Sequence, residues 1–430
     1  MHLQLSFTLV GVLVSAARAH TIFTTLFIND VNQGDGTCVR MPMDSDTCTN
    51  PIAGLQSEDM ACGEYSPSNS FRTLTFSLLL PGRDGQKAVA FTCPAPAGAK
   101  LTFEFREWAD ASNPGSIDKS HAGPCSVYLK RVSNMATTAA AGAGWFKIWD
   151  SGYDANSGKW CTEKLIADNG LLSVNLPTAL PAGYYLVRPE LLALQDAPDD
   201  PQFYVGCAQL FVSGGSVDTL DVPTDREVSI PGHVSSGQKS VTFNIYNSPL
   251  ALPYSPPGPA VFFPTSSPPR IRGRQRRATT TVQTQGLIPT NCLLKNANWC
   301  GREVARYTDE SGCWAASEAC YTQQADCYAQ APPTGDANCE VWGLKCEGIQ
   351  EACGSGAWTG PPDAGKVLAA VQADVPGVIP EAGAVAGIVV TGGVESGDSE
   401  NDASGGGEES ASTSSEAPVA STIVVSPGCA

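Results

Sequence analysis

Histidine is scarce in this chain of 430 residues, and the placement of the few histidines is its clearest chemical signal. An apolar stretch after Leu3, followed by the small-x-small run Ala17-Arg18-Ala19, predicts a secretion signal over residues 1–19. Cleavage at that point makes His20 the first residue of the mature chain and removes His2. The histidines that remain are His20, His121 and His233.

A histidine at the amino terminus offers two metal-binding nitrogens, the α-amine and the imidazole Nδ1, which together close a chelate ring. A second imidazole completes a set of three nitrogen donors. Such a set with open positions favours copper, which lies at the top of the affinity order of divalent first-row ions. The α-amine has an ordinary pKa of ~7.7–8.0 and is readily deprotonated for binding. We therefore expect one copper ion per chain, bound through His20, whereas His233 is expected in a surface loop without a role.

Charge and cysteine content restrict the partners of the chain. The formal net charge of −17 and the pI of about 4.6 argue against nucleic acid and anionic membrane surfaces, so a neutral polymer fits better. No segment after the signal has the length of a membrane span. Sixteen cysteines behind a secretion signal indicate an oxidising compartment. We expect a secreted, extracellular monomer.

Short β-like runs between Gly, Pro, Asn and Asp residues must position these histidines. They predict an all-β domain over residues 20–250, an immunoglobulin/fibronectin-III-like antiparallel β-sandwich. The runs are Ile22–Ile28, Leu101–Phe105, Ser126–Leu129, Tyr184–Arg188, Phe203–Val212 and Val241–Tyr246.

The composition changes after this domain. Residues 251–289 are rich in Pro, Ser and Thr and carry five arginines between Arg270 and Arg277, which is typical of a solvated linker. Residues 357–430 are rich in Ala, Val, Gly, Ser and Glu and are expected to form a disordered tail.

Residues 290–356 contain eight cysteines, and six of them repeat every seven residues. Because a heptad returns to nearly the same helix face, each trio forms a seam along one helix. The break at Ala331-Pro332-Pro333 predicts an antiparallel helical hairpin. Pairing about that turn predicts the disulfides Cys313–Cys353, Cys320–Cys346 and Cys327–Cys339, which leaves Cys292 for Cys300.

Several segments, in order, resemble fungal lytic polysaccharide monooxygenases of auxiliary activity family 9. The resemblance runs from His20 to about Pro257, more than half of the chain. The segments that carry it are His20–Val31, Cys38–Pro42, Ser120–Pro124, Gly144–Ile148, Tyr184–Glu190, Pro201–Leu210 and Val228–Gly232.

This resemblance implies roles for particular residues. His20 and His121 match the two copper ligands, and Tyr204 matches the axial phenol. Gln202, two residues earlier and so on the same strand face, matches the amide that hydrogen-bonds the reacting oxygen. Tyr254 matches a position whose ring stacks on glucose.

Disulfides of this domain follow from two kinds of argument. Cys62 and Cys207 resemble the family's recurrent pair, and Cys38 with Cys48 is predicted from their closeness in the chain. The domain has an odd number of cysteines, seven, so one of them either pairs with Cys429 or stays free.

The implied activity is oxidative cleavage of cellulose or a related β-1,4-glucan at C1, C4 or both, with an external electron donor and O2 or H2O2. One departure bears on it. Gln195 stands in a stretch where the family has a histidine, and glutamine donates a hydrogen bond but does not change protonation state near neutral pH. The alternatives are a non-catalytic copper-binding or wall-associated protein, and a structural wall protein in which the cysteine hairpin is the working part.

Overall fold

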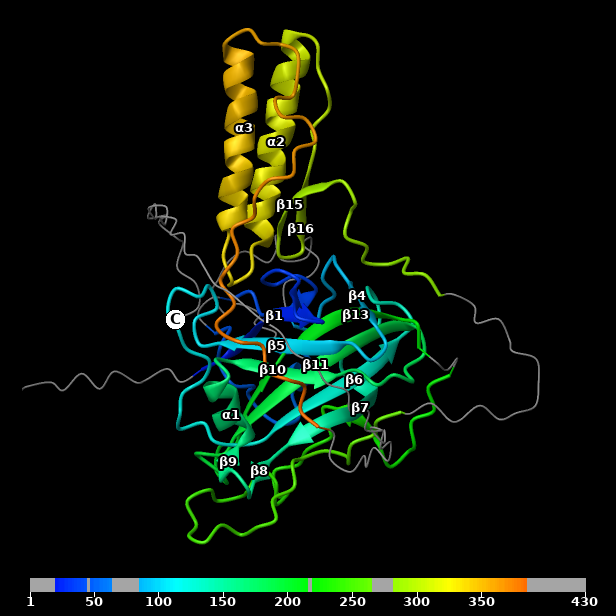
Figure 1. The fold of residues 1–430 in the computed structure, drawn as a ribbon, viewed down its shortest axis with the longest axis vertical. Helices are drawn as coiled ribbons and strands as arrows, with labels where there is room; N and C mark the ends of the chain where they lie inside the picture. The colour runs from blue at the N-terminus through cyan, green and yellow to red at the C-terminus, as the bar shows by residue number, and fades with distance from the viewer. Residues whose placement is uncertain (1–19, 45–46, 64–84, 216–218, 265–280, 385–430) are drawn as a thin grey trace, which may run out of the picture.

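The structure is a computed structural model that describes residues 20–44, 47–63, 85–215, 219–264 and 281–384. The predicted signal, the cluster of linker arginines and Cys429 lie outside these residues. Figure 1 shows a β-sandwich from which a pair of long helices projects. No helix in the described ranges combines the length and apolar character that crossing a bilayer requires.

Two sheets form the sandwich, as the alternation of the sequence predicts. The smaller sheet has the order β10-β5-β1-β2 and the larger the order β14-β7-β6-β11-β13-β3, with β12 paired to β11 and β4 paired to β13. All of these pairings are antiparallel except β4 with β13. The strands are β1 (Ile22–Ile28), β2 (Val31–Asn32), β3 (Val39–Arg40), β4 (Cys93–Pro96), β5 (Lys100–Arg106), β6 (Cys125–Val132), β7 (Gly142–Ser151), β10 (Leu171–Asn175), β11 (Gly183–Ala193), β12 (Gln202–Val205), β13 (Cys207–Ser213) and β14 (Glu227–Ile230).

The central strand β11 is buried along its whole length, because β6 and β13 flank it and both of its faces are covered. Smaller elements lie at the ends of the sheets. They are the 3-10 helix η1 (Glu58–Met60), the ribbon of β8 (Tyr153–Asp154) and β9 (Lys159–Trp160), and helix α1 (Cys161–Ala167).

The prediction of a strand at Val241–Tyr246 is wrong. This segment forms turns, and the backbone N–H groups of Val241 and Thr242 donate to the carbonyl of Gln238 instead of to a neighbouring strand. Its apolar residues contribute to the core instead. Val241 is buried, and the ring centroids of Phe243 and Trp160 are 5.7 Å apart.

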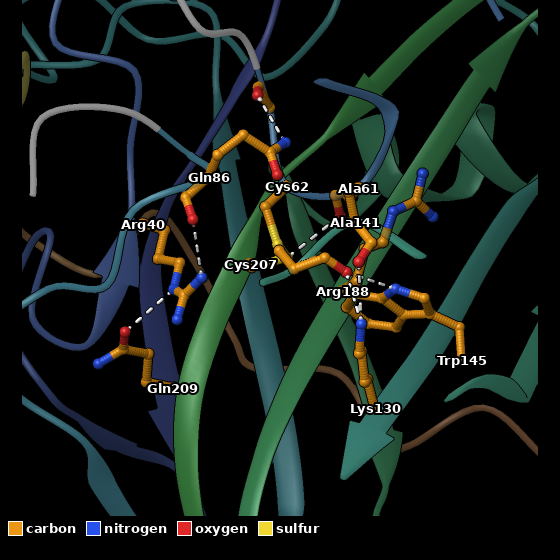
Figure 2. The surroundings of a disulfide bond; sticks show 12 residues. Arg40, Ala61, Cys62, Gln86, Lys130, Ala141, Trp145, Arg188, Cys207 and Gln209 are labelled. Carbon is orange, nitrogen blue, oxygen red and sulfur yellow. Dashed lines mark hydrogen bonds between the residues drawn. A yellow bond between two sulfur atoms is a disulfide. The ribbon is translucent and has the colours of Figure 1, made fainter. Parts of the chain in front are cut away.

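The disulfides of the sandwich correct one prediction. The Cys62–Cys207 bond is present (Figure 2), but Cys38 bonds Cys93 and not Cys48. The reason is the order of strands, since β3 and β4 lie one after the other along the same edge of β13 and bring the Cα atoms of Cys38 and Cys93 to 5.8 Å. Cys125 bonds Cys161, and Cys48 is itself disulfide-bonded.

The C-terminal module is the predicted helical hairpin. Helix α2 (Glu310–Gln330) begins at Asp309, whose side chain accepts from the Gly312 N–H, and α3 (Ala337–Gly354) runs back beside it. The disulfides join the pairs that the heptad spacing predicts, Cys313–Cys353, Cys320–Cys346, Cys327–Cys339 and Cys292–Cys300. A small ribbon of β15 (Cys292–Asn296) and β16 (Trp299–Arg302) packs at the base of the helices.

The segment expected to form a disordered tail from residue 357 takes an extended path over the part that the structure describes, to residue 384. The Leu368 N–H donates to Leu293 of β15, and Asn338 of α3 exchanges hydrogen bonds with the backbone of Val371. Farther along, the Gly383 N–H donates to Ser173 on the edge strand β10. Figure 1 shows this segment running from the helices down to the sandwich.

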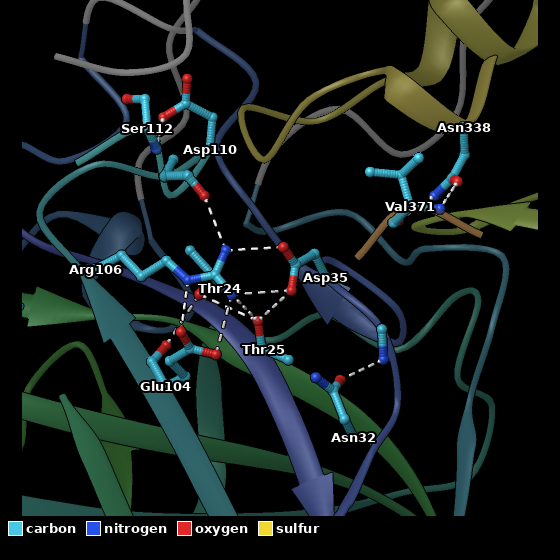
Figure 3. Close-up of polar contacts among 12 residues, drawn as sticks. Thr24, Thr25, Asn32, Asp35, Glu104, Arg106, Asp110, Ser112, Asn338 and Val371 are labelled. Atoms are coloured by element: carbon cyan, nitrogen blue, oxygen red, sulfur yellow. Dashed lines mark hydrogen bonds and ion pairs between the residues drawn. The ribbon is translucent and has the colours of Figure 1, made fainter. Parts of the chain in front are cut away.

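The module also contacts the sandwich directly, at the turn between β15 and β16. Asn298 accepts from the Cys38 N–H and donates to the Gly36 carbonyl, and Thr37 donates to Ala297. Beside this contact lies a polar group in which Arg106 pairs with Glu104 and Asp35 (Figure 3). The hydrogen bonds of Asn298 and Thr37 fix the base of the hairpin against the loop that follows β2.

Candidate metal centre

Three separate segments contain the predicted site residues. His20 lies two residues before β1, His121 lies in the loop before β6, and Gln202 and Tyr204 lie on β12. The rings of His121 and Tyr204 have centroids 5.9 Å apart, and His20 lies close enough for its charge to affect the pKa of His121. The His121 and Tyr204 rings therefore lie side by side, with His20 near His121.

The position of His121 depends on the turn that precedes it, which the sequence analysis did not single out. The Asp118 carboxylate accepts from the Ser120 N–H, and the Asp118 carbonyl accepts from the His121 N–H at 3.0 Å. The Ser120 hydroxyl lies 3.1 Å from Nδ1 of His121. In the tautomer that donates from Nδ1 to this hydroxyl, the Nε2 lone pair is left for a metal ion. An Asp two residues before a Ser is the sequence signal for such a turn.

Burial keeps both aromatic groups of the site neutral. It lowers the pKa of His121, because the imidazolium ion is poorly solvated there, and this effect outweighs the opposing charge of Asp118. Burial, helped by the charges of Asp200 and Asp196, raises the pKa of the Tyr204 hydroxyl well above its ordinary value. At neutral pH the site presents an unprotonated imidazole nitrogen and an intact phenol.

Gln202 connects the remaining residues. Its Oε1 accepts from the Tyr204 hydroxyl at 2.9 Å and from Nε2 of Gln195, also at 2.9 Å. Gln195 reaches it because β12 pairs with the end of β11, where Ala193 lies opposite Gln202. The Oε1 of Gln195 is buried and has no hydrogen-bond partner. Imidazole nitrogens, a neutral phenol and a buried acceptor that lacks a donor are a set that fits bound copper with a small oxygen ligand.

His233 does not lie in a surface loop as the sequence predicts. It is buried, and its Nε2 lies 3.2 Å from Glu190, which also pairs with Arg188 at 2.8 Å. Arg188 in turn donates from Nε and Nη2 to the carbonyl of Met60. The sequence alone does not show that Arg188 and Glu190 are buried. Only the folded chain shows that His233 lies against the ion pair that they form.

His233 is expected to make stability depend on pH. Its pKa is lowered, mainly by burial and against the pull of Glu190, from an unfolded value near ~6.5. As the pH falls below that value, the unfolded chain takes up a proton that folded His233 does not accept, so the free energy of unfolding decreases. We expect His233→Gln to lose less stability than the wild type between pH 7 and pH 5 in urea titrations. Equal losses in the two proteins would contradict this assignment.

Tyr254 is half buried, and its hydroxyl donates to the Ser240 carbonyl at 2.8 Å. Its ring packs edge-on against Trp160 and Phe243, with centroids 4.8 and 5.0 Å away. These contacts account for the tyrosine as part of the packing between β9 and the loop after β14. Its role in stacking on a sugar stays a prediction.

A β-sandwich that brings His121 beside a buried tyrosine, with a second histidine near them, is the arrangement expected of a metal-dependent enzyme. Auxiliary Activity family 9 (formerly GH61) has a family model that matches residues 20–254. The chain belongs to this family, so it is a lytic polysaccharide monooxygenase, an oxidoreductase. Members of the family are secreted copper enzymes.

The sequence similarity to related proteins extends beyond the sandwich domain. The chain is 50% identical over 360 residues to an AA9 family lytic polysaccharide monooxygenase C of Aspergillus tamarii, covering 83% of this chain and 91% of the relative. It is 48% identical over 353 residues to monooxygenase H of Botryotinia fuckeliana, covering 80% of this chain and 75% of that one. The solved structure of CvAA9A is 28% identical, with a TM-score of 0.47, over 58% of this chain and 100% of its own.

Proposed function

We propose that His20 and His121 hold one copper ion, with Tyr204 beside it, and that the enzyme cleaves cellulose or a related β-1,4-glucan at C1, C4 or both. The convergence of His20, His121, Gln202 and Tyr204 from separate segments is the observation that carries this proposal. Bound copper supplies redox chemistry that, with an external electron donor and O2 or H2O2, oxidises a C–H bond of the sugar.

The residues of the chain then have distinct tasks. Signal cleavage before His20 would release the α-amine as a third nitrogen donor. His121 stays neutral because it is buried, so its lone pair is available without loss of a proton. Tyr204 keeps its proton and donates it in a hydrogen bond to Oε1 of Gln202, which would fix the Gln202 amide beside a bound copper ion. Gln195 donates to the same oxygen of Gln202.

The direct test uses correctly processed, copper-loaded protein incubated with cellulose, ascorbate and peroxide. Mass spectrometry should detect aldonic acids or C4-oxidised oligosaccharides, and their ratio gives the position of attack. If the protein binds copper but forms no oxidised sugar where another family member does, it is a non-catalytic copper protein. That alternative is supported by Gln195, which lacks the proton-transfer capacity of histidine.

Replacing Gln195 with histidine is expected to increase the yield of oxidised oligosaccharides by about tenfold or more, because positioned proton transfer typically contributes at least that much. Copper content should not change, since Gln195 contacts Gln202 and Asp196 and is not itself a proposed ligand. Gln195→Asn serves as the control, because it alters the contact without adding a titratable group. An equal yield from the wild type and the histidine variant would show that this position does not limit the reaction.

A further inference from the structure

Helix α2 carries a row of three aromatic side chains that the metal centre does not explain. Trp314, Tyr321 and Tyr328, here called the aromatic row, are spaced by seven residues, which places neighbours about 10.5 Å apart along the helix axis. A heptad turns by only ~20° from the same face, so the three rings lie nearly in line. Trp314 and Tyr328 are 43% and 42% exposed, and Tyr321 is half buried.

The aromatic row lies on the side of the hairpin that the rest of the module leaves open. The opposite side is closed by the ribbon, because Gln323 exchanges hydrogen bonds with Arg302 of β16 and Trp342 packs against Trp299. Gln323 is two residues from Tyr321 and therefore points more than half a turn away from it. Figure 1 shows the helices standing clear of the sandwich over most of their length.

Disulfides hold this surface rigid. Each aromatic residue directly follows a cysteine of the seam, and those cysteines bond α3 at Cys353, Cys346 and Cys339. The Tyr321 hydroxyl is further fixed by Gln350 of α3 at 2.8 Å. Rings that are held in place lose little entropy when a ligand binds, so the row is suited to recognition of an extended molecule.

The chemistry around the row excludes an anionic ligand. Helix α2 contains no lysine or arginine but has Glu310, Glu318 and Asp326. Amides lie beside the rings, since Gln324 donates to the Cys339 carbonyl and Gln350 accepts from Tyr321. Aromatic faces with neighbouring amides and no cation suit a neutral molecule that has both C–H faces and hydroxyl groups.

We propose that the aromatic row binds an extended β-1,4-linked glucan chain, an inference that rests on the proposed function for the choice of polymer. The axial C–H bonds of a pyranose ring are electropositive and stack on the negative face of an aromatic ring. Each sugar of such a chain is turned over relative to the last, so the same face recurs at every second sugar. Two linked pyranose rings and one helical heptad have similar lengths, so every ring of the row meets an equivalent sugar face. The hairpin thus anchors the enzyme on its polymer.

The test measures depletion of the full-length, copper-loaded protein from solution by microcrystalline cellulose, without an electron donor. We expect Trp314→Ala/Tyr328→Ala to lower the partition coefficient by roughly tenfold, because two stacking contacts are lost. Leu344→Ala is the matched control, since it removes a more exposed apolar side chain, 66% exposed, from α3. The control should bind like the wild type.

Two results would overturn the inference, namely wild-type binding by the double variant or an equal loss in Leu344→Ala. Circular dichroism and thiol titration check that the disulfides and helices are intact. Trp314→Leu/Tyr328→Leu keeps apolar area without ring faces, and it should lose binding as the alanine pair does.

Oxidised sugars from the same samples, measured after an electron donor is added, separate this inference from the proposed function. A wild type that binds through the row but yields no oxidised product would disprove the function and leave the inference standing. A double variant that binds normally and still yields oxidised product would disprove the inference and leave the proposed function standing.

Discussion

His121→Ala is expected to lower copper affinity by more than about 100-fold and to abolish oxidised products from cellulose. The estimate is a lower limit, because loss of a residue that merely supports a ligand already costs about 10–100-fold in metal affinity. His121 is the proposed ligand that needs no processing of the chain, and burial keeps it unprotonated at neutral pH. Isothermal titration with Cu(II) gives the affinity, and electron paramagnetic resonance gives the nitrogen ligands.

The matched control is His233→Gln. His121 and His233 are both 5% exposed, so each substitution removes a buried imidazole. His233 contacts Glu190 and Tyr128 and not the metal centre, so its variant should keep full copper stoichiometry. Unchanged copper affinity in His121→Ala would remove the basis of the proposed site.

The largest expected loss of stability comes from Glu190→Gln, at about 3–5 kcal/mol in the free energy of unfolding. Arg188 is fully buried, and Glu190 is its only anionic partner among the described residues at 2.8 Å. With the carboxylate gone, the guanidinium keeps its bonds to the Met60 carbonyl but has no charge to balance it. Arg188 and His233 also hold the pKa of Glu190 at about 2 despite burial, so the carboxylate is charged throughout the usual pH range.

Asp363→Asn provides the comparison, because it also converts a paired carboxylate into an amide. Its pair with Lys366 is exposed on both sides, and such pairs contribute about 0–1 kcal/mol. Urea-induced unfolding of both variants with disulfides intact measures the difference. Similar losses in the two variants would mean that the buried group contributes no more than a surface ion pair.

Local patterns were sufficient for much of the fold. The run Ile22–Ile28 is rich in β-branched and aromatic residues, and it forms β1 with the bounds predicted. The cysteine heptads predicted both helices of the hairpin and their bonds, because a repeat of seven constrains a helix face without reference to the rest of the chain. Val241–Tyr246 has a similar composition to β1 but forms turns, in which the N–H groups of Val241 and Thr242 bond the Gln238 carbonyl and not a strand.

For the site, too, some features follow from the sequence and others only from the tertiary structure. The sequence by itself predicted which residues supply the chemistry, since His20 follows a cleavage pattern and histidines are few, and since Gln202 and Tyr204 share a strand face by the period of two. It also marked Gln195 as a departure. Only the tertiary structure decided which of these residues meet, that Gln195 and Tyr204 share one carbonyl of Gln202, and that His233 lies buried against Glu190. The meeting of these residues depends on segments that are far apart in the chain and become neighbours only when the sheet around β11 and β13 assembles. The Cys38–Cys93 bond could not be predicted from the sequence for the same reason.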